Sequence, residues 1–271
     1  IRSQLADSQL DSETIESVLT RVDEENQEKQ FWSKTDKGVI KITHILFKQF
    51  LEDNGFYKYC PEGGKNYIFV KVTNNLIDHT DEKSIKDFIL NYLIELDDIS
   101  IYNYFADQTR FFREEFLTLL STIDIYFIED TKNASYLYYL NCAVKITKDD
   151  ITTLDYLDLG GYVWKDHVIN RNFNSCNVSK DFSFKKFISN ICKSEDDRVS
   201  SMESTIGFMM HGYKNLSYCP AIILNDEVIS DNPEGGTGKG LFMNALSKMK
   251  KVVTIDGKSF AFERSFAYQL V

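Results

Sequence analysis

The chain has 271 residues, of which 43% are apolar and 14% aromatic, and it contains only three prolines. This composition predicts two packed domains built from long regular elements, and it excludes a disordered or linker-rich protein. The net charge at pH 7 is −10. Residues 239–271 hold six basic and two acidic side chains, which leaves 25 basic and 39 acidic side chains in residues 1–238. The acidic body disfavours a nucleic-acid groove there, whereas the basic tail can face the phosphates of a nucleotide or of DNA.

The cysteines indicate a reducing compartment, because none of them belongs to a C-x-x-C pair that would suggest a disulfide framework or a zinc site. They are Cys60, Cys142, Cys176, Cys192 and Cys219. No apolar run reaches the roughly 18 residues that span a bilayer, and no signal peptide opens the chain. We therefore expect a cytoplasmic protein without a membrane partner. Because the first residue is Ile1 rather than Met, we also expect a portion of a longer polypeptide.

Residues 1–37 are interpreted as a helix and a charged connector, and residues 38–193 as an α+β module. An amphipathic helix from about residue 42 ends at the pair Asn54-Gly55. Strands at 56–60 and 66–72 flank the turn Pro61-Glu62-Gly63-Gly64, which predicts a hairpin. Asn74-Asn75 then predicts a second turn, into a strand at 76–79.

The rest of this module changes from helices to strands. Helical spacing predicts one helix over 81–96 and another through 111–120. Residues 123–130, 135–147 and 162–169 are rich in β-branched and aromatic residues, which predicts strands. A helix follows at 181–192, with Asp181 or Ser183 as a possible N-cap.

The last part of the chain, residues 194–271, is predicted to begin a second domain, with the boundary near Lys193-Ser194-Glu195. It opens with a long helix over 196–211, for which Gly212 is a natural C-cap. The apolar run Ala221 to Leu224 predicts a buried strand of an α/β sheet, and Val252 to Ile255 predicts another. Together these elements predict an α+β N-terminal module followed by the beginning of an α/β P-loop domain.

The chemistry of the sequence lies between these two predicted strands. Residues 235–240 read G-G-T-G-K-G, and apolar residues at helical spacing follow them. Glycines let successive backbone N–H groups turn toward phosphate oxygens, and the start of a helix adds further N–H donors and the positive end of its dipole. A lysine at the end of such a loop reaches the β- and γ-phosphates as a point charge. The candidate nucleotide-binding residues are Gly235, Gly236, Thr237, Gly238, Lys239 and Gly240.

The loop departs from the pattern G-x-x-x-x-G-K-[S/T] at two positions. Pro233 stands where the first glycine is expected, although Gly235 and Gly236 still supply backbone freedom. Gly240 follows the lysine, so the hydroxyl that ordinarily ligates Mg²⁺ is missing, and phosphates, water and acids elsewhere would have to hold the ion. The alternative interpretation is an ordinary glycine-rich turn with an exposed lysine.

Weaker candidates have simpler structural explanations. Asp155 and Asp158 resemble a paired-carboxylate metal site, but they have no third ligand and fit a turn better. The four histidines lack a metal-ligand spacing; they are His44, His79, His167 and His211. Aromatic residues that could stack bases are more typical of core packing; they are Tyr136, Tyr138 and Tyr139. Basic residues that could touch DNA also fit a solvated helix end; they are Lys248, Lys250 and Lys251. No metal site and no catalytic residue is assigned.

The run G-G-T-G-K-G-L-F, with I-D-G-K-S-F and F-A-Y-Q-L-V after it, resembles the ATPase region of superfamily 3-type helicases in phage and mobile-element primase-helicases. The upstream runs I-T-H-I-L-F-K-Q-F-L-E-D-N-G-F-Y-K-Y and I-K-D-F-I-L-N-Y-L are similar to the module that precedes this ATPase in poxvirus-type primase-helicases. Together they cover most of residues 38–271. In such proteins glycine at the position of Gly240 is not unusual.

The resemblance implies an AAA+-like ATPase that uses ATP and Mg²⁺ to move along DNA in replication, assembled as a homo-oligomer, usually a hexameric ring. It places the phosphate loop at residues 235–239, and the acidic motif, sensor and arginine finger beyond Val271. Whether a primase domain precedes Ile1 is left open. Two alternatives remain open as well. One is another P-loop NTPase, for example a packaging or partition ATPase. The other is a non-catalytic oligomerisation or docking module with a vestigial P-loop.

Overall fold

The structure is a computed structural model, and it describes residues 30–64, 66–96, 98–175, 182–226 and 236–257. Within these residues the fold is mixed α/β, with several sheets and seven α-helices. The chain divides into two compact units. The first contains residues 30–73 and 77–125, and the second contains 74–76 and the described residues from 126 onward. The division at 1–37, 38–193 and 194–271 stays a prediction.

The first unit begins with a short antiparallel pair, β1 (Trp32–Lys34) and β2 (Ile40–Ile42). Helix α3 (His44–Asp53) follows and ends where the sequence predicted, at Asn54 and the left-handed Gly55. The helix predicted in residues 1–37 falls mostly on residues 1–29, which lie outside the described residues. Residues 32–34 of the predicted connector form strand β1.

Three strands of the first unit confirm the predicted hairpin and the predicted turn after it. Strand β3 (Phe56–Tyr59) pairs antiparallel with β4 (Ile68–Thr73), with Phe56 opposite Lys71. Strand β5 (Leu76–His79) pairs with the other edge of β4. The turn between β4 and β5 is Asn74-Asn75, and both asparagines have positive φ. Asparagine tolerates this region well, which explains why the sequence signal was reliable here.

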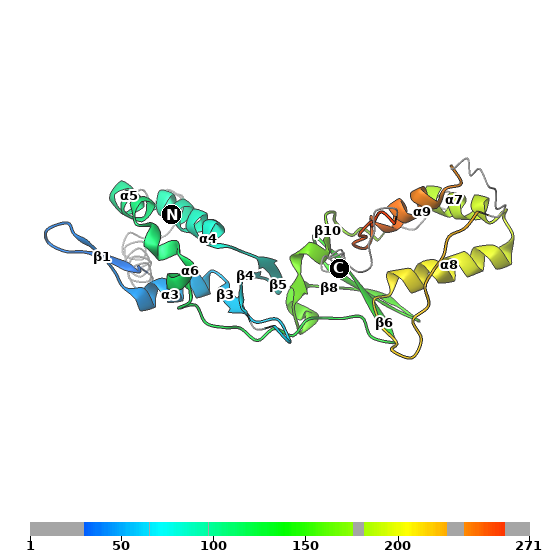
Figure 1. The fold of residues 1–271 in the computed structure, drawn as a ribbon, viewed down its shortest axis with the longest axis horizontal. Coiled ribbons are helices and arrows are strands. Elements are labelled where there is room, and N and C mark those ends of the chain that lie inside the picture. The colour runs from blue at the N-terminus through cyan, green and yellow to red at the C-terminus, as the bar shows by residue number, and fades with distance from the viewer. Residues whose placement is uncertain (1–29, 65, 97, 176–181, 227–235, 258–271) are drawn as a thin grey trace, which may run out of the picture. The chain divides into compact units, whose positions relative to one another are not determined.

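The helices of the first unit are α4 (Glu82–Glu95), α5 (Ile99–Asp107) and the short α6 (Glu114–Leu117), with a 3₁₀ turn at Thr109–Phe112. Figure 1 shows α4 and α5 beside each other. Helix α4 confirms the prediction for 81–96. The prediction of one helix through 111–120 was wrong, because Arg113 is extended and divides it into two short pieces. Helix α5 was not predicted at all.

The first unit has an aromatic core. Phe31 lies at its centre, fully buried, with ring centroids 5.1 Å from Phe47 and 5.7 Å from Phe105. Leu51 of α3 and Ile89 of α4 are also fully buried in this cluster. Tilted and edge-to-face ring pairs of this kind add to the hydrophobic free energy of burial.

The second unit contains a sheet in the order β10-β6-β7-β8. Its strands are β6 (Ala134–Tyr139), β7 (Ala143–Thr147), β8 (Ile151–Leu154) and β10 (Val168–Ile169), and the short β9 (Val163–Trp164) and two 3₁₀ turns (Tyr156–Leu159, Lys165–His167) lie between β8 and β10. Strand β6 is antiparallel to β7 and parallel to β10. The strand predicted at 123–130 was wrong: within this range a single isolated bridge forms, from Phe127 to Tyr162.

Three helices complete the second unit: α7 (Ser183–Ile191), α8 (Asp196–Met210) and α9 (Lys239–Leu246). Both helices predicted before the glycine loop are confirmed. Their predicted caps were wrong. Phe182 occupies the N-cap of α7, and Asp181 lies outside the described residues. His211 is the C-cap of α8, and Gly212 is not left-handed.

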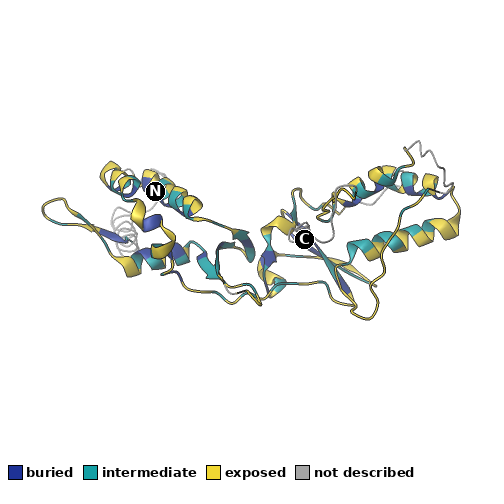
Figure 2. Ribbon diagram, in the orientation of Figure 1, coloured by how far each residue is buried: buried dark blue, intermediate teal, exposed yellow. Residues whose placement is uncertain are grey.

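The three helices share one hydrophobic cluster. Its buried members are Ile188 and Cys192 at α7 and Phe242 and Leu246 of α9. Helix α8 contributes partly buried side chains, including Met202 and Ile206, and no residue of α8 is fully buried (Figure 2). The tight turn between α7 and α8 has positive φ at Lys193 and Ser194. This cluster sets the position of α9, the helix that begins at the predicted phosphate-binding lysine.

Candidate functional site

The candidate site is the start of α9. The helix predicted after the glycine run is confirmed as α9, which begins at Lys239 with Gly238 as its N-cap residue. Gly236 and Gly238 have φ of +78° and +92°, a region that glycine enters at little cost and other residues rarely adopt. Thr237 lies between them, and Gly240 lies in the first turn of the helix. Gly235 is outside the described residues. Gly236 and Gly238 therefore hold a backbone conformation that other residues would resist.

The helix start offers backbone donors. The first intrahelical bond runs from the N–H of Phe242 to the carbonyl of Gly238, at 2.9 Å. The N–H groups earlier in the first turn have no intrahelical acceptor. Among the residues that the structure describes, no side chain caps this helix. These donors, together with the positive end of the helix dipole, favour an anion.

The ammonium of Lys239 lies over the loop. It donates to the hydroxyl of Thr237 at 2.8 Å and to a carboxylate oxygen of Asp226 at 2.5 Å. The hydrogen bond from Lys239 and a second one from Thr237 lower the pKa of the Asp226 carboxyl. The Lys239 and Asp226 side chains are 41% and 28% exposed. The lysine is thus folded back toward the glycines, within reach of solvent.

The loop also packs closely against α7. A Cβ placed on Gly238 would lie 3.2 Å from Phe187 Cε2 and 3.3 Å from its Cζ. The same test on Gly236 and Gly240 finds no heavy atom within 4 Å. Gly238 is therefore required twice, once for its left-handed backbone and once for its approach to the Phe187 ring. Because there is open space beside Gly240, packing does not require a glycine at this position in place of serine or threonine.

The sheet predicted around this loop is wrong for the described residues. Neither Ala221–Leu224 nor Val252–Ile255 is a strand, and Ile223 is 79% exposed. A buried parallel strand exists only where neighbours satisfy its backbone on both sides. Within the described residues no strand pairs with either segment. The structure therefore gives the helix and the described part of the loop; the two predicted strands were wrong, and the P-loop fold as a whole stays a prediction.

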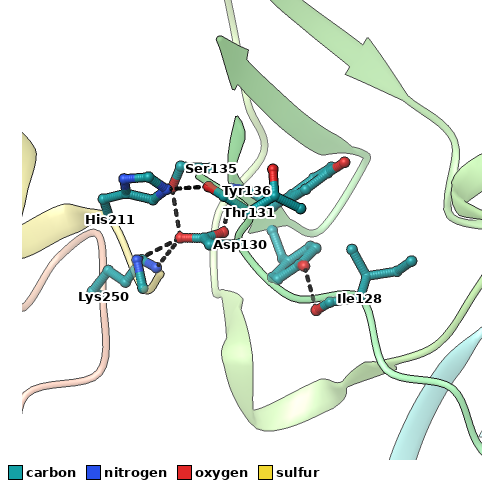
Figure 3. Close-up of polar contacts among 9 residues, drawn as sticks. Ile128, Asp130, Thr131, Ser135, Tyr136, His211 and Lys250 are labelled. Carbon is teal, nitrogen blue, oxygen red and sulfur yellow. Dashed lines mark hydrogen bonds and ion pairs between the residues drawn. The ribbon is translucent and has the colours of Figure 1, made fainter. Parts of the chain in front are cut away.

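A buried carboxylate holds the other end of α9 (Figure 3). The Asp130 side chain is 6% exposed and accepts from Lys250 Nζ, just beyond α9, at 3.3 Å. It also accepts from the N–H of Gly212 after α8, at 2.6 Å, and from the N–H of Tyr136 in β6, at 2.7 Å. Ser135 Oγ donates to it at 2.8 Å. Asp130 therefore joins the ends of α8 and α9 to strand β6.

The balance of effects on Asp130 favours its charged form. Burial raises the pKa of its carboxyl, and the hydrogen bonds from Gly212, Ser135 and Tyr136 outweigh burial and lower it. Lys250 adds a favourable charge. Beside this group, His211 lies with Nε2 2.7 Å from the carbonyl oxygen of Thr131. Sequence reasoning missed both Asp130 and Asp226, although each stands two residues after the end of an apolar run, where polar residues commonly gather at the edge of a sheet.

The weaker candidates have structural roles. Asp155 accepts from the N–H of Leu157 and caps a 3₁₀ turn. The His44 ring packs edge-to-face on Phe116. Tyr138 and Tyr139 are buried in β6, so their rings are not a stacking surface for bases. In the part of the chain that the structure describes, no three His, Cys, Asp or Glu side chains are grouped as a metal site would need.

Comparison of the chain with protein-family models and with curated proteins finds no match. No helix in the described ranges combines the length and the apolar character that crossing a membrane requires.

Proposed function

We propose that the loop before α9 binds the phosphates of ATP, and that the chain is part of an ATP-dependent DNA helicase of the primase-helicase type. The observation that carries the proposal is the combination at Gly238 and Lys239. A left-handed glycine leads directly into an uncapped helix start, and the lysine folds back over the same loop. Backbone donors, the helix dipole and a cation then converge on one place, which is the arrangement that a phosphate chain needs.

The residues present fit a nucleotide better than they fit a complete magnesium site. The amides of the first turn of α9 would bind phosphate oxygens, and Lys239 would neutralise part of their charge. Mg²⁺ would supply further neutralisation of the phosphate charge. Gly240 offers no hydroxyl to the ion, so its other ligands would be water or acidic groups.

Nucleotide affinity tests the first half of the proposal. Binding of a fluorescent ATP analogue with Mg²⁺ is measured for the chain, Lys239→Ala and Lys248→Ala. Losing one hydrogen bond to a charged group costs about 1.5–3 kcal/mol, so we expect Lys239→Ala to weaken binding by about tenfold to a hundredfold. Lys248 is the matched control, because it is an exposed lysine just after the same helix. Equal affinity of wild type and Lys239→Ala would reject the proposal.

DNA stimulation tests the second half, in the protein that contains this chain. We expect ATP hydrolysis that single-stranded DNA accelerates and that Lys239→Ala abolishes. Hydrolysis that depends on Lys239 and is indifferent to DNA would assign the loop to another kind of P-loop NTPase. Absence of nucleotide binding with retained self-association would favour the oligomerisation or docking module.

A further inference from the structure

Asp226 occupies a position that the nucleotide-binding proposal does not explain. Its carboxylate is the anion that Lys239 holds in this structure, at 2.5 Å, although it comes from a segment 13 residues earlier in the chain. Lys239 also donates to Thr237, and the Thr237 hydroxyl in turn donates to Asp226. The three side chains form a closed set of hydrogen bonds in front of the glycine loop.

From this geometry we infer that Asp226 competes with the phosphates of an incoming nucleotide for Lys239, whose ammonium Thr237 also binds at the loop. This inference rests on the proposed function. A lysine ammonium has three N–H donors on a flexible stem, so it can exchange one anion for another by rotation of its side chain. The partial exposure of both partners leaves room for that exchange.

Charge decides the direction of the effect. A carboxylate beside the loop attracts Lys239 away from the phosphates and also repels them, and both effects weaken nucleotide binding. Asp226→Asn removes the charge and keeps the shape and an acceptor oxygen. Thr237 still holds the ammonium over the loop in that variant. Positioning is therefore retained while competition is lost, and the affinity for nucleotide rises.

The test compares nucleotide affinities of the wild type, Asp226→Asn and the matched control Asp98→Asn. Lys34 and Asp98 form an ion pair of similar length, 2.6 Å, with side chains 42% and 33% exposed, and it belongs to the first compact unit. Asparagine still caps helix α5 at position 98, so the control changes net charge equally without unfolding that helix. We expect Asp226→Asn to bind the ATP analogue about three- to tenfold tighter at low salt, and Asp98→Asn to bind like the wild type.

Two further readouts separate competition from a merely structural role. The gain in Asp226→Asn should grow from AMP to ADP to ATP, because repulsion increases with phosphate charge, and it should shrink as salt is added. Asp226→Ser, which also removes the charge, should show the same order. A gain that is equal for all three nucleotides and independent of salt would overturn the inference.

The remaining outcomes distinguish failure of this inference from failure of the proposed function. Unchanged or weaker binding in Asp226→Asn, with binding still lost in Lys239→Ala, overturns the role of Asp226 alone. Weaker binding in Asp226→Asn that is confined to solutions with Mg²⁺, and absent in EDTA, would make Asp226 a metal ligand and overturn the competition as well. Absence of nucleotide binding in every variant, including the wild type, overturns the proposed function itself.

Discussion

Replacing Gly238 by alanine tests whether the left-handed backbone and the close approach to Phe187 require a glycine at this position. The backbone of Gly238 has φ of +92°, where an L-residue with a Cβ costs about 1–2 kcal/mol. The new Cβ would also lie 3.2 Å from Phe187 Cε2, so the ring, or the start of α9, must shift by a few tenths of an ångström. We expect a total cost of about 2 kcal/mol for the local stability of α9.

Two neighbouring glycines provide controls with different expected signs. Gly236 has φ of +78° and open space around a built Cβ, so Gly236→Ala should cost only the conformational part, about 1 kcal/mol. Gly240 lies inside α9, is not left-handed and also has open space. Gly240→Ala should therefore stabilise the helix, by up to about 1 kcal/mol, because alanine has the higher helix propensity.

The assay is amide hydrogen exchange of a peptide that covers α9, which reports local opening rather than unfolding of the whole chain. A loss of about 2 kcal/mol corresponds to roughly thirtyfold faster exchange, and a gain of about 1 kcal/mol to roughly fivefold slower exchange. The expected order of protection is Gly240→Ala, wild type, Gly236→Ala, Gly238→Ala. Equal protection of Gly238→Ala and Gly236→Ala would show that contact with Phe187 adds no cost. Loss of protection in Gly240→Ala would refute the reasoning from backbone conformation.

Three further predictions concern the rest of the chain. Asp130→Ala should cost about 1–3 kcal/mol in urea unfolding, because it removes the shared acceptor of the N–H groups of Gly212 and Tyr136. Since the folded pKa of Asp130 is lowered, its contribution is present above about pH 4 and is lost as the pH falls further. Asp130→Asn should therefore flatten the loss of stability in acid. Phe47→Ala should cost about 3–5 kcal/mol, because Phe47 is fully buried, whereas unchanged unfolding would refute the aromatic core. Iodoacetamide at pH 8 should label the exposed Cys60 and Cys219 rapidly and Cys142 only after unfolding, because burial raises the pKa of the Cys142 thiol; mass spectrometry of the labelled peptides checks this order.

Local signals explain which elements could be predicted from the sequence. The turn Asn74-Asn75, the end of α3 at Gly55 and the N-cap Asp81 of α4 each depend on residues close in the chain. Helix α5 was missed because its sequence, I-S-I-Y-N-Y-F-A-D, mixes β-favouring residues without a clear period, although Asp98 caps it. The Asp98 cap was the signal that could have revealed this helix. The cap and the packing of α5 on α4 together outweigh the strand preference of its residues.

A strand forms only when another strand pairs with it, and the local sequence does not indicate which segment that will be. Residues 221–224 and 252–255 have the composition of buried strands, yet no neighbouring strand pairs with them in the described residues. Residues 123–130 show the same difference between composition and pairing. At the candidate site, the glycines and the start of α9 were predictable from spacing. The partner of Lys239 was not, because Asp226 reaches it only through the fold of the chain between them.

Under the proposed function, the position of α9 limits what must move when a phosphate binds. At its start, Gly238 lies against Phe187, and beyond its end Lys250 is held by Asp130. Between these two points Phe242 and Leu246 are buried in the cluster shared with α7 and α8. A helix fixed at both ends and along one face keeps its backbone donors in place, so ligand binding need not pay for ordering them. The exchange of Asp226 for a phosphate then reduces to a rotation of the Lys239 side chain, which is why removing one carboxylate charge should change affinity without changing the stability of α9.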